Sequence, residues 1–597
     1  MILFWGIVGI LNGIFLPGAM VTVLASPRLN VSRFLSISLV LSLIINYIIC
    51  LTLIIPGFYT KHVMISLFIF YLFIIISSYF IKSANISAKT SISKNYNIDN
   101  SISLSVCIEE KNLKIIYYIC FFIAFIFIFL FYHKILFKGV DPIVNWNAWA
   151  VSWANNTYPK TMGDYPQLMP IIMGIPYLFM GQEIPQVFSI LSLELITLIS
   201  ILCFYTLKSS NYSYGSAVAA LGTVWLFIVT GVGYADVIVG ILALMAFSIF
   251  QWHLAELKEQ RHDSFFLYAA FSAAAASATI KQSGLFWWPF FILIVIEGYK
   301  LNNYKYLEII EKIIIPVILS LLIIFPWYIY NRYLIYLGKN NSMTNYFLNA
   351  TGLFHGHSFF SRSIYSIFKY FYYTIFALPA IWGLKRPGYR ALSLSCLFIM
   401  FSWALFFSYG PGNVKFPVML AFFPLGLFMK SAITQKSHIF LWTCLSRRIS
   451  IIKTSILTWP RLYLVSFLVC LLAICFFFSS KIDSNLINFH KNEALKLGKV
   501  GLTRRVDYLE KLNPQKIVSF QAQLKQVMSI PKGYYTYSVP PKNFLDYGYL
   551  VINDNILQII DTELLYDNYY EDYKEDEFHL YVRKNLNIFN LPCLNNP

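Results

Sequence analysis

The sequence predicts an all-α membrane domain that crosses the bilayer many times, followed by a small α/β domain at its C-terminal end. Of the 597 residues, 58% are hydrophobic and only 12% are charged, and the mean hydropathy is +0.62. The apolar residues gather in runs of about 20, the length that spans a bilayer as a helix. Residues 481–597 are polar and mixed instead, and this length is sufficient for a separate domain.

Charge and cysteine content narrow the functional classes. Lys and Arg number 46 against 28 Asp and Glu, which gives a net charge of +18. In a membrane protein such an excess indicates cytoplasmic loops rather than a nucleic-acid partner. The nine cysteines stand singly, without a CxxC pair, so neither a disulfide framework nor a thiolate metal site is expected. His355 and His357 lack further ligands nearby, and no metal or other cofactor is indicated.

The first four apolar runs set the orientation of the chain. Segments 26–33 and 82–114 between them are basic, whereas 57–62 is nearly neutral. Basic segments stay in the cytoplasm, so the N-terminus and the loop that follows the fourth run, 138–185, are expected outside. Residues 1–114 are interpreted as an extension of three membrane helices with a cytoplasmic loop. The four runs lie near residues 2–25, 34–56, 62–81 and 115–137.

The stretch Leu168–Met180 decides the orientation of every later run. It is short and contains Pro170 and Pro176, so it is predicted to be a juxtamembrane or re-entrant piece rather than a span. If it does not cross, the later basic segments all fall in the cytoplasm, whereas a crossing would place them outside, against the charge rule. The total is then about fourteen spans. The later ones are expected near residues 186–207, 215–233, 237–254, 265–281, 284–300, 311–333, 363–384, 391–409, 415–432 and 460–480.

The C-terminal residues 481–597 have the pattern of a compact α/β domain on the external side. Residues 500–512 have helical periodicity, and the acidic run 567–577 is predicted to be a solvated loop. Short runs of β-branched and aromatic residues predict three strands, at 516–520, 549–552 and 577–584.

The external loop begins with an acid and three tryptophans. Asp141 follows directly on an apolar run, so its carboxylate is expected where a membrane helix meets water. Trp146, Trp149 and Trp153 are spaced by three and four residues, which places them on one face of a short helix. This aromatic face is expected to lie flat among the lipid headgroups. An ordinary interfacial loop with an aromatic belt is the alternative.

Several ionisable residues converge on the predicted external side. Charged groups beside a hydrocarbon slab are costly unless they pair or have a function. Asp236 in GVGYADVIVG and Lys281 in ATIKQSG are candidates for a functional site, but they are equally expected to pair simply to satisfy their burial. Glu194 is interpreted as a satisfied core carboxylate. The converging residues are Asp141, Asp164, Asp236, Lys281, Arg332, Arg362 and Lys415.

The order of these motifs resembles that of a known class of enzymes. In sequence they are Asp141, Asn147-Ala148-Trp149-Ala150, Asp164-Tyr165-Pro166, Gly233-Tyr234-Ala235-Asp236 and Thr279-Ile280-Lys281-Gln282-Ser283-Gly284. Their order and shared sidedness over residues 115–480 resemble the membrane glycosyltransferases of the GT-C fold. The likeness extends to bacterial relatives of the protein O-mannosyltransferases and the lipid A aminoarabinose transferases.

This resemblance implies a polyprenyl-phosphate sugar as donor and an acceptor hydroxyl on a lipid, glycan or protein outside the cytoplasm. The active site would then face outward from a bacterial cytoplasmic membrane, within residues 115–480. Inverting transfer needs a carboxylate to take the acceptor proton and cations to hold the departing phosphate. Asp141 is the expected base, and Asp236 would orient Lys281 or the acceptor. Phosphate-binding candidates are Lys281, Arg332, Arg362 and Lys415, and substrate contacts are expected from Asp164, Tyr165, Trp146, Trp149 and Tyr234.

Two other functional classes fit the same composition. A transporter or flippase for a lipid-linked or anionic substrate would also place charges inside the membrane. Inverted repeats with paired broken helices would indicate that class, and the sequence contains none that we detect. A non-catalytic assembly protein is the third class, and it leaves the charged residues without an explanation.

Overall fold

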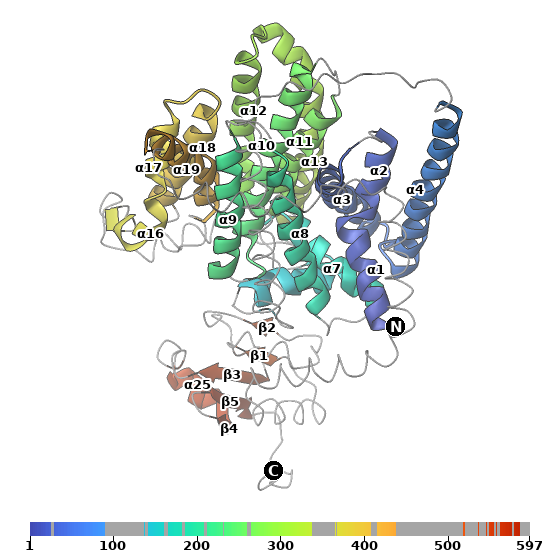
Figure 1. The fold of residues 1–597 in the computed structure, drawn as a ribbon. Coiled ribbons are helices and arrows are strands. Elements are labelled where there is room, and N and C mark those ends of the chain that lie inside the picture. Colours follow the sequence, from blue (N-terminus) through green and yellow to red (C-terminus); the bar gives the residue numbers. More distant parts are fainter. Residues whose placement is uncertain are drawn as a thin grey trace, which may run out of the picture. The chain divides into compact units, whose positions relative to one another are not determined.

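A computed structural model gives the arrangement of most of the helical part and of part of the C-terminal sheet (Figure 1). It describes residues 1–25, 29–89, 137, 141–159, 165–181, 186–207, 212–230, 232–259, 264–336, 364–365, 367–406, 415–436, 517–519, 535–536, 545, 548–553, 557, 562–575 and 578–584. The predicted spans 115–137 and 460–480 and the predicted helix 500–512 lie outside these residues, apart from Phe137.

The described residues are mostly helical. The helices are α1 (Ile2–Ile14), α2 (Leu16–Ala25), α3 (Val31–Ile54), α4 (Lys61–Lys89), η2 (Asp141–Asn147), α6 (Ala148–Ala154), α7 (Leu168–Met180), α8 (Val187–Tyr205), α9 (Ser213–Thr230), α10 (Ala235–Lys258), α11 (Phe265–Ile280), α12 (Gln282–Lys300), α13 (Tyr306–Tyr336), α16 (Phe371–Thr374), α17 (Ala377–Gly383), α18 (Arg390–Phe406) and α19 (Lys415–Lys436). The chain divides into two compact units. One holds nearly all of these helices, and the other holds the C-terminal strands together with η2.

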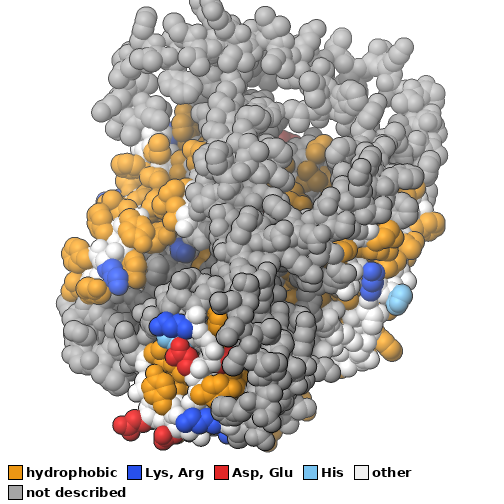
Figure 2. Space-filling model, turned by 90° about the horizontal axis from the view of Figure 1, so that it is seen from below, with side chains coloured by type: hydrophobic (Ala, Val, Ile, Leu, Met, Phe, Trp, Pro, Cys, Tyr) orange, Lys and Arg blue, Asp and Glu red, His pale blue; other side chains and the backbone are white. Residues whose placement is uncertain are grey.

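Several of the helices have the length and composition of membrane spans. Within the described residues, five helices are long and apolar enough to cross a bilayer, or six if the bent pair α1 and α2 counts as one span. Large apolar side chains are exposed on α4 and α13, where Phe73, Leu322 and Ile329 are each about two thirds exposed. Seen from below, hydrophobic side chains gather on both flanks of the described surface (Figure 2). Such faces are stable against lipid rather than water. The chain therefore has the architecture of a membrane protein, while the predicted total of about fourteen spans remains a prediction.

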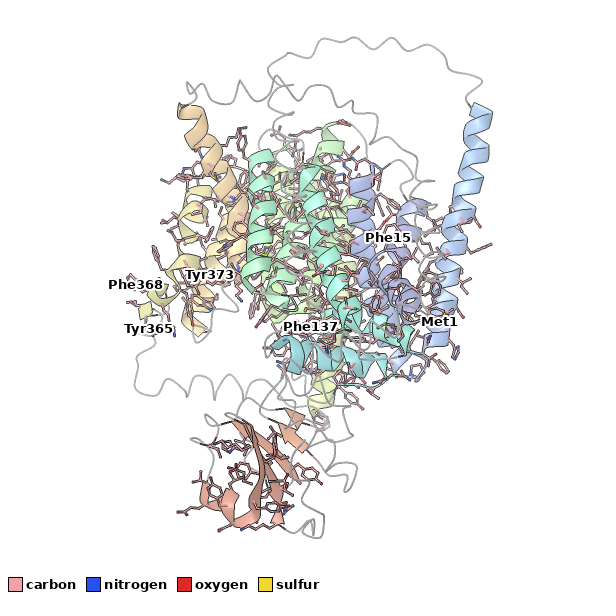
Figure 3. All side chains as sticks on the ribbon, turned by 60° about the horizontal axis from the view of Figure 1, so that its bottom comes forward. Met1, Phe15, Phe137, Tyr365, Phe368 and Tyr373 are labelled. Atoms are coloured by element: carbon pink, nitrogen blue, oxygen red, sulfur yellow. The ribbon has the colours of Figure 1, made fainter. Side chains whose placement is uncertain are left out.

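The first apolar run is two helices, not one. Helices α1 and α2 are bent by 43° at Phe15 (Figure 3). Pro17 has no N–H, so the Gly13 carbonyl loses its donor within the helix. The Asn46 amide of α3 donates to this carbonyl at 3.1 Å, and the Gly18 N–H donates to the Ser42 hydroxyl at 2.8 Å. Polar side chains of α3 thus satisfy the backbone groups that the bend exposes.

The close packing of α2 on α3 predicts a position-specific loss of stability. A Cβ atom at Gly18 would overlap the Ser38 carbonyl oxygen, whereas one at Gly13 would have its nearest neighbour 3.7 Å away. We expect Gly18→Ala to lower the free energy of unfolding by about 1–3 kcal/mol. Gly13→Ala is the matched control and should be neutral or stabilising, because Ala favours a helix by up to about 1 kcal/mol. Equal thermal stability of the two variants in detergent would show that α2 and α3 can move apart enough to accept the added methyl group.

Two of the predicted apolar segments differ from ordinary spans. Helix α7 has 13 residues, all buried, and its length of about 20 Å is too short for a hydrocarbon core of about 30 Å. The bounds match those of the predicted short piece Leu168–Met180, whose failure to cross the membrane stays a prediction. The predicted span 363–384 contains two short helices, α16 and α17, separated by a turn at Ile375–Phe376, and its crossing of the membrane stays a prediction. Before this turn, Tyr365 and Phe368 project away from the bundle and are exposed (Figure 3).

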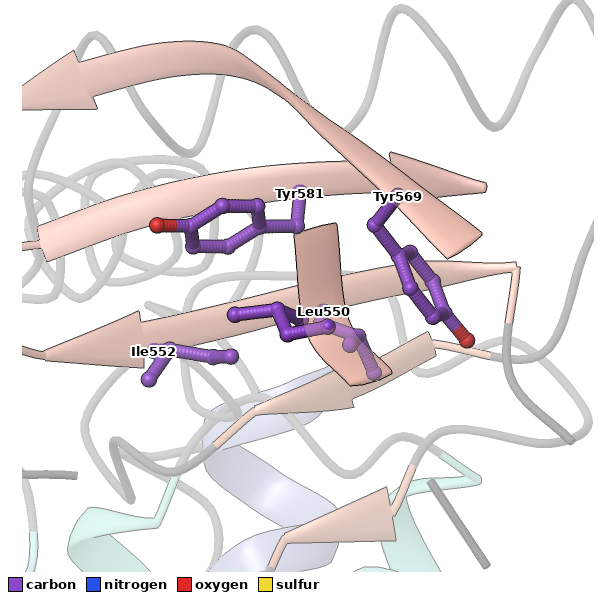
Figure 4. Packing of buried hydrophobic residues seen from close by; sticks show 5 residues of the cluster. Leu550, Ile552, Tyr569 and Tyr581 are labelled. Atoms are coloured by element: carbon purple, nitrogen blue, oxygen red, sulfur yellow. The ribbon is translucent and has the colours of Figure 1, made fainter. Parts of the chain in front are cut away.

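The C-terminal unit contains a five-stranded mixed sheet in the order β2-β1-β3-β5-β4. Its strands are β1 (Ile517–Ser519), β2 (Tyr535–Thr536), β3 (Tyr549–Asn553), β4 (Tyr569–Glu575) and β5 (Phe578–Arg583), and α25 (Thr562–Asn568) precedes β4. Strands β1, β3 and β5 match the three predicted ones. Strand β1 is parallel to β2 and β3, whereas β5 is antiparallel to β3 and β4. Leu550, Ile552, Tyr569 and Tyr581 form its core together with Leu565 (Figure 4).

The acidic run 567–577 was wrongly predicted to be a loop. Its central residues form the edge strand β4, which pairs with β5 along its length. The backbone hydrogen bonds to β5 and the burial of Tyr569 stabilise this strand. The acidic side chains Glu571 and Glu575 remain compatible with it, because charges on an edge strand hinder pairing with other chains.

Candidate functional site

The centre of the candidate site is an ion pair between two helix ends. Asp236 lies in the first turn of α10 and is 4% exposed. Lys281 stands in extended backbone between α11 and α12. Its Nζ lies 2.9 Å from both carboxylate oxygens of Asp236. The two residues therefore meet, as both the functional and the purely structural interpretation require.

The turn that holds Lys281 depends on small residues. Helix α12 starts directly after Lys281, so it must leave the last turns of α11 at close range. A Cβ atom at Gly284 would overlap the Ser277 carbonyl, and only glycine allows this approach. The Ser277 hydroxyl in turn donates to the Val239 carbonyl of α10 at 3.2 Å. This contact ties the end of α11 to the start of α10 and fixes Lys281 opposite Asp236.

Three helix N-termini converge around Asp236. Helix α10 begins at Ala235, α12 begins at Gln282, and α19 begins at Lys415. Lys415 is 8% exposed, and its Nζ lies 4.9 Å from the ring of Tyr234, the residue before α10. A helix N-terminus carries about half a positive charge. Two lysines and three N-termini thus outweigh one carboxylate, and such an arrangement attracts an anion such as phosphate.

Arg332 lies on the same end of the bundle but is not part of the ion pair. The Tyr328 hydroxyl donates to the Ala278 carbonyl at 3.1 Å, which ties α13 to the last turn of α11. Arg332 stands one turn further along α13 and is exposed, about 6 Å along the axis from Tyr328. The structure therefore does not bring Arg332 into the Asp236–Lys281 pair.

The loop tryptophans do not form the predicted interfacial face. Trp146, Trp149 and Trp153 are 4%, 3% and 0% exposed, so protein rather than lipid headgroups surrounds them. The Trp149 ring lies 5.8 Å from the ring of Tyr165, and the Trp153 indole N–H donates to Gln167 at 3.0 Å. The expectation of an aromatic face against the membrane was therefore wrong. Trp149 and Trp153 pack instead on Tyr165 and Gln167, in the segment that leads into α7.

Three site candidates have no described side chain. Asp141 is the first residue of the π-helix η2, but only its backbone is described. Asp164 and Arg362 lie outside the described residues, as do His355 and His357. Among the residues that the structure does describe, no three His, Cys, Asp or Glu side chains lie close enough together to hold a metal ion.

An aromatic contact that the sequence did not indicate joins the segment after α6 to α13. The ring of Tyr158 lies 5.4 Å from Trp153, 6.0 Å from Trp327 and 5.5 Å from Tyr330. Burial, together with the neighbouring Tyr330, raises the pKa of the Tyr158 phenol well above its ordinary value. No spacing in the sequence links residues so far apart.

The N-terminal helices also contact the segment after α6. The Asn156 amide donates to the Gly57 carbonyl, in the turn between α3 and α4, at 2.8 Å. Asn156 adopts a positive φ of 53°, a conformation that Asn tolerates better than most residues. The turn between α3 and α4 therefore holds the segment that follows the loop tryptophans, a contact that the sequence did not suggest.

Comparison of the chain with protein-family models, with curated proteins and with solved structures finds no match.

Proposed function

We propose that this chain is a membrane glycosyltransferase that moves a sugar from a polyprenyl-phosphate donor to an acceptor hydroxyl, with inversion. In this proposal the fold is GT-C-like with about fourteen spans, and the site faces outward from a bacterial cytoplasmic membrane. The observation that carries the proposal is the cationic centre at Asp236, where three helix N-termini meet Lys281 and Lys415. A lipid-linked donor keeps its chain in the bilayer, so its phosphate must be held at the end of a helix bundle.

The proposed reaction assigns a task to each charged group. Asp141 takes the proton of the acceptor hydroxyl, whose oxygen forms a bond to the anomeric carbon of the sugar. The bond from that carbon to the phosphate oxygen breaks, and the polyprenyl phosphate leaves with the electron pair. Lys281 and Lys415 stabilise the negative charge that develops there, and Arg332 and Arg362 are further candidates. Asp236 holds the Lys281 ammonium in place through the two 2.9 Å contacts.

Substrate contacts are proposed for the half-buried Tyr165 and Tyr234 and for Asp164. Trp146 and Trp149 are covered by protein, so their contribution would be to hold the loop rather than to stack on the sugar.

The outward orientation can be tested with reporter fusions. We expect fusions at Ser152, Gly356 and Asn553 to report the external side, because basic segments remain in the cytoplasm. Fusions in the basic segments should report the cytoplasm. The fusion points are Thr90, Gln260 and Gly388. An external signal at Gln260 would invert half of the spans and separate the candidate residues by the thickness of the membrane.

The function itself is tested by following the fate of the donor. The protein is reconstituted in vesicles with a panel of polyprenyl-phosphate hexoses and pentoses and a membrane extract as the source of acceptors. Release of free polyprenyl phosphate, abolished in Asp141→Asn, is the expected result. Movement of an intact lipid-linked sugar between leaflets, without release, would identify a transporter or flippase instead. If neither occurs with any donor, the proposed chemistry is wrong.

A further inference from the structure

A second candidate binding feature lies along α19, away from the end of that helix where the proposed chemistry takes place. An open apolar groove with a volume of about 340 Å³ runs between α16, α17 and α19, and this volume lies within the range of about 300–1,000 Å³ that is typical of ligand sites. Leu378 and Phe428 in its wall are 63% and 45% exposed. The lining residues are all apolar: Ile375, Phe376, Leu378, Pro379, Leu425 and Phe428.

One end of this groove is aromatic and basic. The ring of Trp382 meets that of Phe428 edge to face at 5.5 Å, and the guanidinium of Arg386 lies over the Trp382 ring at 4.6 Å. Leu378, Trp382 and Arg386 follow one another at steps of four residues, so they lie along one side of α17 and the turn after it. The groove therefore leads from exposed aliphatic side chains through a tryptophan to an exposed arginine.

Other cations lie near this end, and one carboxylate of the described residues is bonded to the backbone of the same turn. Lys385 is exposed beside Arg386, and Lys430 on α19 lies over the Tyr214 ring at 5.8 Å. The Glu297 carboxylate reaches the same turn, but it accepts the backbone N–H groups of Gly388, Arg390 and Ala391, at 2.7, 3.3 and 2.8 Å respectively. Three exposed cations in this turn, Lys385, Arg386 and Arg390, outnumber this single carboxylate, so the turn has a net positive charge.

This basic end is remote from the candidate active site. Lys415 starts α19 and Lys430 stands 15 residues later on the same helix, a distance of about 22 Å along the axis. Helices α17 and α19 run in the same direction, because Trp382 meets Phe428 while Leu378 and Leu425 line the groove together. The basic end of the groove is therefore near the opposite membrane surface from Lys281 and Lys415.

We propose that this groove is a site for an anionic phospholipid, with one acyl chain along Leu378, Leu425 and Phe428 and the headgroup phosphate at Arg386. The apolar groove excludes a polar ligand, and a cation with an interfacial tryptophan at its end matches a lipid headgroup. Arg386 is suited to phosphate because its guanidinium donates two parallel hydrogen bonds. A polyprenyl phosphate bound at Lys415 could place only its chain in the groove, because its phosphate would lie at the other end of α19. The inference does not depend on the proposed enzyme activity.

Lipid binding to the purified, delipidated full-length chain tests this site. Phosphatidylglycerol, phosphatidylcholine and inorganic phosphate are the probes, and bound lipid is counted by native mass spectrometry across a titration. We expect the wild type to prefer phosphatidylglycerol and Arg386→Gln to lower its affinity about fivefold, since a basic residue near anionic lipid contributes about 1 kcal/mol. Arg390→Gln removes the same charge from the start of α18 and should change affinity by less than twofold.

The groove itself is tested by filling it. Leu378 is largely exposed, so Leu378→Trp should leave the melting temperature in detergent unchanged while it displaces the acyl chain and weakens phosphatidylglycerol binding. Equal binding of the two phospholipids, or equal effects of Arg386→Gln and Arg390→Gln, would overturn the proposal. If inorganic phosphate binds with the same affinity as phosphatidylglycerol, the site recognises only an anion and the proposal is wrong. If Leu378→Trp weakens the binding of polyprenyl phosphate alone, the groove holds the donor chain and the proposal is wrong.

Discussion

Lys281→Met is expected to destabilise the protein and to weaken its binding of polyprenyl phosphate at the same time. The substitution leaves the Asp236 carboxylate, 4% exposed, without the cation that now lies 2.9 Å from both of its oxygens. Loss of one partner of a buried pair costs about 3–5 kcal/mol of unfolding free energy. The missing ammonium should also lower donor affinity by about tenfold or more, the scale of a hydrogen bond to a charged group.

The double variant separates the two roles of Lys281. Combining Lys281→Met with Asp236→Asn removes both charges, so most of the lost stability should return. Donor affinity should not return, because the phosphate still lacks its cation. Thermal unfolding and polyprenyl phosphate binding are measured for both single variants and for the double. Lys305→Met, an exposed lysine near the start of α13, is the control and should leave both quantities unchanged.

Recovery of both stability and affinity in the double variant would exclude Lys281 from phosphate binding. The pair would then serve only to satisfy its own burial. Lys415 and the arginine candidates Arg332 and Arg362 would then have to stabilise the departing phosphate.

Asp141→Asn should lower turnover by about a hundredfold or more, the usual scale for the loss of a general base. The substitution preserves size and removes only the ability to accept a proton. Binding of polyprenyl phosphate and the melting temperature should therefore stay close to those of the unchanged chain. Turnover is followed as release of polyprenyl phosphate from the donor that proves active.

Asp572→Asn is a suitable control, because this carboxylate lies in β4 of the C-terminal sheet and has no proposed part in the reaction. Turnover near the original value in Asp141→Asn would contradict the assignment and move the base to Asp164 or Asp236. A parallel loss of donor binding would instead indicate that Asp141 orders the substrate site.

The sequence by itself determined where most of the helices lie. The apolar runs 34–56, 237–254 and 265–281 correspond closely to α3, α10 and α11. This agreement has a physical cause, because the thickness of the hydrocarbon core dictates both the length and the composition of a spanning helix. Strands β3 and β5 were predictable from composition, since short runs of β-branched and aromatic residues favour a strand that is covered on its faces.

Only the tertiary structure decided how these elements meet. The bend between α1 and α2 depends on amide and hydroxyl groups of α3, and the acidic run became strand β4 because β5 pairs with it. The loop tryptophans turned inward because Gln167 and Tyr165 offer them partners. Asp236 and Lys281, 45 residues apart, meet because α11 packs along α10 and returns its end to the start of that helix. Periodicity records which face of a helix is apolar, but the identity of the partner across that face is a property of the folded chain.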